Sequence, residues 1–149
     1  LDLRMYYDEY RPILLKVSPD LSHEQLDEII DYCLRSGIDG LVAGNTTRSR
    51  DGITSISKEK IEEIGNGGLS GAPLHKKNLE LVRYVHAKSE GKLPIIGVGG
   101  IMTPQQAKDM LDAGASLVEI YSGFIYEGPE LIKKIIKHLE NKAKPTSKA

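Results

Sequence analysis

The stretch Pro94-Ile95-Ile96-Gly97-Val98-Gly99-Gly100-Ile101 decides the fold of this 149-residue chain. Its apolar run after Pro94 is typical of a buried parallel strand. The run ends in Gly99-Gly100, and Thr103-Pro104 then begins a helix with the proline in its first turn. Backbone N–H groups of a glycine pair can approach anion oxygens, and the dipole of the following helix favours negative charge. The stretch therefore indicates either a phosphate-binding strand end or a tight turn that binds nothing.

The same strand-then-helix pattern occurs four times along the chain. We expect strands over residues 12–17, 40–43 and 116–121 and from residue 94, with helices after Ser22 and over 73–88, 104–113 and 130–140. A long loop over 48–72, with one helical turn near 58–64, interrupts the second unit. Repeated βα units imply parallel strands, arranged either as a doubly wound sheet or as a barrel. A full eight-stranded barrel needs about 250 residues, so four units would make half of one.

This half-barrel reading divides the chain into three parts. Residues 1–11 are expected to be a helix end or linker, residues 12–140 the four βα units, and residues 141–149 a disordered tail. A half-barrel leaves two apolar strand edges open, and open edges invite pairing with another chain. We therefore expect a dimer or an aggregation-prone fragment.

Composition limits the classes of function. The formal net charge of −1 provides no field to recruit nucleic acid or an anionic membrane. The lone Cys33 excludes an internal disulfide and fits a reducing compartment. No run approaches membrane-spanning length, and no basic-apolar signal opens the chain. The four histidines share no metal-ligand spacing, so no metal site is expected.

Polar residues collect where the expected strands end, which is where parallel α/β sheets bind ligands. Lys16, at the end of an apolar strand, should face an anion or a cavity, or else extend outward into solvent. Asn45, Thr46 and Thr47 follow the second strand and either fix a planar polar ligand or act as ordinary turn residues. Glu119, which is expected inside a buried strand, should need a polar partner, and a lysine of another layer is the candidate.

Two further segments offer backbone N–H groups. Residues 67–71, Gly-Gly-Leu-Ser-Gly, form either a flexible linker or an anion nest before the helix at Pro73. Tyr121-Ser122-Gly123 follows the fourth strand, beside the end of the strand that carries Gly99-Gly100. Two adjacent strand ends converging on one point match the barrel phosphate site.

Taken in order, these motifs resemble the quinone-linked, class 2 dihydroorotate dehydrogenases. The matching stretches cover nearly the whole chain and are residues 15–21, 44–47, 67–71, 95–101 and 113–122. The resemblance implies an α/β fold, the C-terminal half, (βα)4, of a TIM (β/α)8 barrel. The family carries FMN, oxidises dihydroorotate to orotate in pyrimidine biosynthesis and passes electrons to quinone. It also implies a whole enzyme held peripherally on the cytoplasmic side of the cell membrane, the chain itself being soluble or cytoplasmic.

The resemblance assigns roles to individual residues. Lys16 would lie near the flavin ring, Asn45 and Thr46 would bind orotate, and the remaining cofactor-binding residues would be Gly44, Gly71, Gly99, Gly100, Tyr121 and Ser122. Many members carry a hydroxyl residue where this chain has Gly44. The catalytic base of the family is a serine in a part of the barrel that this chain lacks, so no catalytic residue is expected here and the chain alone should have no turnover.

The expected partners are the missing N-terminal half of the barrel or a second copy of the chain, and no nucleic acid. The alternative reading is a non-catalytic half-barrel that binds FMN or phosphate and self-associates.

Overall fold

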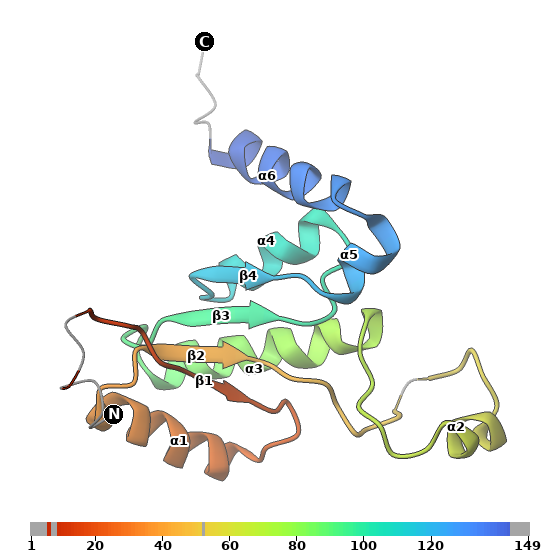
Figure 1. Cartoon of the computed structure of the whole chain (residues 1–149), viewed down its shortest axis with the longest axis horizontal. Helices are drawn as coiled ribbons and strands as arrows, with labels where there is room; N and C mark the ends of the chain where they lie inside the picture. Colours follow the sequence, from red (N-terminus) through yellow and green to blue (C-terminus); the bar gives the residue numbers. More distant parts are fainter. Residues whose placement is uncertain (1–5, 7–8, 52, 144–149) are drawn as a thin grey trace.

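The computed structural model describes residues 6, 9–51 and 53–143. It contains one four-stranded sheet with the strand order β1 (Leu14–Val17), β2 (Gly40–Ala43), β3 (Ile95–Val98) and β4 (Leu117–Glu119). All three pairings are parallel, and the register aligns Lys16 with Val42, Val42 with Ile96 and Ile96 with Leu117. The four arrows accordingly point the same way in Figure 1. The expected parallel sheet of successive βα units is confirmed.

A helix follows each strand, although not always directly. The four long helices are α1 (His23–Ser36), α3 (His75–Lys88), α4 (Pro104–Asp112) and α6 (Glu130–Ala143). Local signals fix their ends: Ser22 and Gln25 form the expected capping box of α1, and Gly37 closes that helix in the left-handed conformation. Thr103 and Gln106 form a second capping box in front of α4.

The hydrophobic core fills the space between the sheet and these helices. Its largest fully buried apolar side chains are Ile30, Leu41, Val82, Val85, Ile95 and Met110. Leu26, Ile30 and Cys33 give α1 its buried side, as the spacing predicts. Two apolar residues of these helices, Leu34 of α1 and Ile136 of α6, are instead 42% and 51% exposed. Both helices therefore bury a narrower stripe than their apolar sequence suggests.

Several boundaries differ from the expected ones. Pro73 lies in a 3-10 turn, η2 (Ala72–Leu74), so α3 begins two residues later than expected. The helical turn expected near residues 58–64 of the long loop is present as α2 (Lys58–Ile64). This loop projects beyond the strand ends on one side of the molecule (Figure 1). The expected fourth strand over residues 116–121 shortens to β4, because Tyr121, with φ −123° and ψ −78°, leaves the extended conformation and starts the unexpected helix α5 (Ser122–Glu127).

The ends of the chain were expected to be irregular. Helix α6 continues to Ala143, so residues 141–143 are helical and not part of a tail. Residues 144–149 and most of residues 1–11 lie outside the described part of the chain.

Strands β1 and β4 each pair on one side only within the described residues. Leu15 of β1 is 36% exposed and Leu117 of β4 is 62% exposed. Such apolar edge strands are templates for pairing with further strands. Among residues 6, 9–51 and 53–143, no helix has both the length and the apolar character required to cross a membrane.

Candidate functional site

A pocket of about 420 Å³ lies at the carboxyl ends of the strands. Strands β1, β3 and β4 contribute to it, together with the segment that follows β2 and the segment that precedes α3. The lining includes Lys16, Gly44, Asn45, Thr46, Ser70, Gly71, Gly99, Gly100, Glu119, Tyr121 and Ser122. All nine residues that the sequence nominated for cofactor or substrate binding therefore surround one cavity. Its volume lies within the range typical of small-molecule sites.

The floor of the pocket is built on glycine. Gly99 and Gly100 have φ values of 105° and 74°, which side-chain-bearing residues rarely adopt. A Cβ at Gly100 would lie 2.2 Å from the backbone nitrogen of His75, and one at Gly99 would lie 2.1 Å from Nδ2 of Asn78. The turn after β3 thus rests directly against the first turns of α3, and only glycine permits this approach.

Residues beneath this floor hold the strand ends together. Asn78, fully buried, donates a hydrogen bond of 2.7 Å from Nδ2 to the carbonyl of Val98, which also accepts from the amide of Gly44 at 3.1 Å. Sequence reasoning missed Asn78, and a polar residue on the apolar side of α3 was the signal that could have found it.

His75 begins α3 beside the same turn. Burial lowers the pKa of its imidazole, although Asp109, whose carboxylate lies 3.8 Å from Nε2, acts in the opposite direction.

A side chain at position 44 would press against the side chains of α3. A Cβ there would lie 2.9 Å from Cδ2 of Leu81 and 3.0 Å from Oδ1 of Asn78. The side chains of α3 occupy the space that a larger residue would need, so the second strand meets the pocket through its backbone.

The loops on either side of the glycine floor are in contact. The hydroxyl of Ser122 donates to Oγ of Ser70 at 3.3 Å, which joins the segment after β4 to the segment before α3. Tyr121 is 79% exposed at the rim. The convergence of residues 99–100 with residues 121–122, on which the sequence argument rested, is present in the structure.

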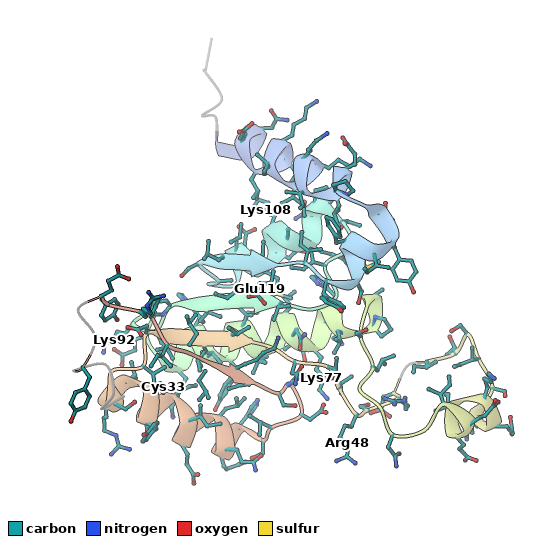
Figure 2. All side chains as sticks on the ribbon, viewed as in Figure 1. Cys33, Arg48, Lys77, Lys92, Lys108 and Glu119 are labelled. Atoms are coloured by element: carbon teal, nitrogen blue, oxygen red, sulfur yellow. The ribbon has the colours of Figure 1, made fainter. Side chains whose placement is uncertain are left out.

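Two opposite charges lie on the edge strands that border the pocket. Lys16 lines the cavity from β1 and is exposed, and no described residue gives it a hydrogen bond or ion pair. Glu119 lines it from β4 (Figure 2). The expectation that Glu119 is buried and needs a polar partner was wrong, because β4 is an edge strand and leaves this side chain exposed.

Thr47 does not join its two predecessors at the pocket. Asn45 and Thr46 line the cavity, whereas Thr47 is 5% exposed and bonds to Asp20. In the parts of the chain that the structure describes, no group of three or more His, Cys, Asp and Glu side chains is placed to hold a metal ion.

Parallel strands with following helices, and a glycine-lined pocket where the strands end, place this chain in the class of β/α-barrel proteins. A family model described as dihydroorotate dehydrogenase matches residues 5–143, and the chain belongs to the dihydroorotate dehydrogenase family. This family is flavin-dependent, and its members are oxidoreductases.

Curated relatives and solved structures agree with this assignment. The dihydroorotate dehydrogenase (quinone) of Proteus mirabilis is 44% identical over 139 residues, which are 93% of this chain and 40% of the relative. That of Christiangramia forsetii is 52% identical over 125 residues, 84% of this chain and 35% of the relative. The enzyme from Eimeria tenella in complex with ferulenol superposes with a TM-score of 0.79 at 37% identity, over 89% of this chain and 34% of that one. The chain therefore spans about two fifths or less of the length of these relatives.

Proposed function

We propose that this chain forms the FMN-binding, C-terminal half-barrel of a quinone-linked dihydroorotate dehydrogenase of pyrimidine biosynthesis. One observation carries the proposal. The glycine floor at Gly99-Gly100, the segment at Tyr121-Ser122 and the unpaired cation of Lys16 all face one cavity at the strand ends. This arrangement suits an anion attached to a larger planar group.

The residues of the pocket fit the phosphate of FMN. Gly71, Gly99 and Gly100 line the pocket and carry no side chain of their own, so their N–H groups can serve as donors to phosphate oxygens. The Ser122 hydroxyl supplies a further donor at the same point when it turns from Ser70 toward the phosphate. Tyr121 adds an exposed aromatic edge to the rim.

The other side of the pocket suits the flavin ring and the substrate. FMN, when bound, accepts the electrons removed from dihydroorotate. Lys16, with no partner of its own among the described residues, stabilises negative charge that develops next to it. Asn45 and Thr46 carry an amide and a hydroxyl, which hold the polar edges of orotate by hydrogen bonds.

Proton abstraction requires a group that this chain does not supply. The ionisable side chains that line the pocket within the described residues are Lys16, Glu119 and Tyr121, none of which corresponds to the serine base of the family. The chain alone therefore binds and orients FMN without turning over dihydroorotate. Within the whole enzyme, the remaining part of the barrel closes the pocket, and electrons leave to quinone at the cytoplasmic side of the membrane.

Flavin titration tests the proposal. The purified chain is titrated into FMN and, separately, into riboflavin, which lacks the phosphate, and flavin fluorescence is recorded. We expect FMN to bind at least about tenfold more tightly, because charge-assisted hydrogen bonds to phosphate are lost with riboflavin. Equal affinities would refute the phosphate site, and no binding of either flavin would refute cofactor binding by this chain.

The catalytic part of the proposal has its own assay. Dihydroorotate-dependent reduction of a dye is measured with the FMN-loaded chain, with a relative that contains the whole barrel as the positive control. We expect no reduction above the rate without protein. Turnover by the chain alone would show that it carries its own proton acceptor.

A second function, a self-associating half-barrel that binds FMN or phosphate without catalysis, is favoured by the edge strands. Leu15 and Leu117 lie on opposite edges of the sheet and expose apolar surface that a second copy of the chain would cover.

A further inference from the structure

Thr47 is a buried polar residue whose hydroxyl is fully engaged. It donates to Oδ1 of Asp20 at 2.5 Å and accepts from the amide of Ser49 at 3.1 Å and from Nζ of Lys77 at 3.2 Å. Lys77 also forms an ion pair with Asp20, whose other oxygen accepts from the amide of Arg48 at 2.7 Å. The loop after β1, the loop after β2 and the first turn of α3 therefore meet at one hydroxyl.

The backbone of Thr47 links two segments that line the pocket. Its amide donates to the carbonyl of Leu69 at 3.1 Å, and its carbonyl accepts from the amide of Leu69 at 2.7 Å. On one side of this bridge lie Asn45 and Thr46, and on the other side lie Ser70 and Gly71. One residue thus joins the proposed substrate-binding segment to part of the proposed phosphate-binding segment.

The segment that contains Thr46 and the segment that contains Gly68 lie in close contact. A Cβ at Gly68 would lie 2.1 Å from Oγ1 of Thr46, so only glycine fits opposite that side chain. Neither segment belongs to a helix or a strand, and the chain between them runs outward through α2 (Figure 1). Because a long connection leaves its two ends free to separate, a specific clamp is needed to keep the pocket walls in register.

We propose that Thr47, held by Asp20 and Lys77, is a positioning residue that fixes Asn45 and Thr46 relative to Ser70 and Gly71, and so sets the shape of the FMN and orotate pocket. The inference deepens the proposed function and rests on it for the identity of the ligand. Thr47 itself does not line the pocket. Figure 2 shows Lys77 near the strand ends, with Arg48 beyond it toward the projecting loop.

The molecule contains a natural control for this clamp. Asp27 on α1 accepts hydrogen bonds from Tyr84 at 2.7 Å and Lys88 at 2.8 Å, both on α3. This second carboxylate also ties the first βα unit to α3 by one lysine and one hydroxyl, but none of its members lines the pocket. Removing it should loosen the packing of α1 on α3 without separating the pocket segments.

The test compares Thr47→Val, which keeps the shape and removes the hydroxyl, with Thr47→Ser, which keeps the hydroxyl, and with the control Asp27→Asn. Amide hydrogen exchange is measured on each full chain, together with its thermal midpoint and its Kd for FMN. In Thr47→Val we expect exchange at Thr47 and Leu69 to rise about tenfold or more, and the Kd for FMN to rise about tenfold, because the hydroxyl anchors a buried bridge. Thr47→Ser should restore both values toward those of the parent chain.

A purely structural role would lower the thermal midpoint of Thr47→Val and of Asp27→Asn alike, without a selective change at Thr47 and Leu69. That result would overturn the inference, as would wild-type exchange at both amides in Thr47→Val. If the parent chain binds no FMN, the proposed cofactor fails. The exchange data then still decide whether Thr47 couples the two segments.

Discussion

Replacing Gly100 by alanine tests the contact between the pocket floor and α3. A Cβ at this position meets the backbone nitrogen of His75 at 2.2 Å and its Cα at 2.5 Å, so the helix backbone cannot rotate out of the way as a side chain could. The residue also has a φ of 74°, where a β-carbon adds strain. Gly100→Ala therefore combines backbone strain with steric overlap.

Gly37→Ala separates these two contributions. Gly37 has almost the same φ, 75°, but no atom lies within 4 Å of a Cβ built there. The strain alone should lower the free energy of unfolding by about 1 kcal/mol at Gly37. The overlap at Gly100 should add about 1–3 kcal/mol, the usual cost of overpacking a site that cannot relax.

Urea denaturation of the two variants and the parent chain measures the difference. If the turn relieves the overlap by moving away from α3, the N–H groups at residues 99–100 are displaced as well, so Gly100→Ala should also lose affinity for FMN whereas Gly37→Ala should not. Equal losses of stability in the two variants would refute the close approach of the turn and α3, and unchanged FMN affinity in Gly100→Ala would refute the place of this turn in the site.

Three further predictions concern charge and association. Partial burial alone would raise the pKa of Asp20, but hydrogen bonds from Lys77, Thr47 and the Arg48 amide outweigh it and lower the pKa to about 2. The contribution of Asp20 to the free energy of unfolding should therefore be complete above about pH 5 and fall by about 1 kcal/mol as the pH drops to about 2, after allowance for solvent screening; an unchanged pH dependence in Asp20→Asn urea titrations would contradict this. Lys16→Met should weaken FMN binding several-fold while Lys92→Met, at a remote ion pair with Glu90, should not; equal titration curves for the two variants would remove Lys16 from the site. Light scattering should give a mass above that of one chain, reduced by Leu117→Lys on the open edge of β4; a single-chain mass at all concentrations would exclude association through the edges.

Local signals carried most of the fold that the sequence predicted. The Ser22–Gln25 and Thr103–Gln106 capping boxes and the glycine at position 37 act within a few residues, so they can be recognised without knowing the tertiary structure. The glycine pair after β3 is equally local, because positive φ and close approach both require glycine there. The capping signals therefore located the helix ends, and the glycine pair located the pocket floor, from the sequence alone.

What the sequence did not reveal depends on distant partners. Thr47 does not line the pocket, because its hydroxyl forms hydrogen bonds with Asp20 and Lys77, each about 30 residues away in the sequence. Asn78 stands out in the sequence as a polar residue among the apolar positions of α3, but its place beneath Gly99 follows only from the packing of that helix. Helix α5 carries no side-chain cap at Tyr121, so no local motif marks where it begins.

The edge strands explain why the exposure of Glu119 could not be read from the sequence. The central strands β2 and β3 are largely buried, whereas β1 and β4, Leu-Leu-Lys-Val and Leu-Val-Glu, are equally apolar and mostly exposed. Strands of this composition are typical of sheets with a neighbour on each side. Since Lys16 and Glu119 lie on these two edges and border the same pocket, we infer that strands added at the edges would also complete the pocket wall. The exposure of both residues follows from the position of β1 and β4 at the edges of the sheet, where no described strand pairs with their outer sides.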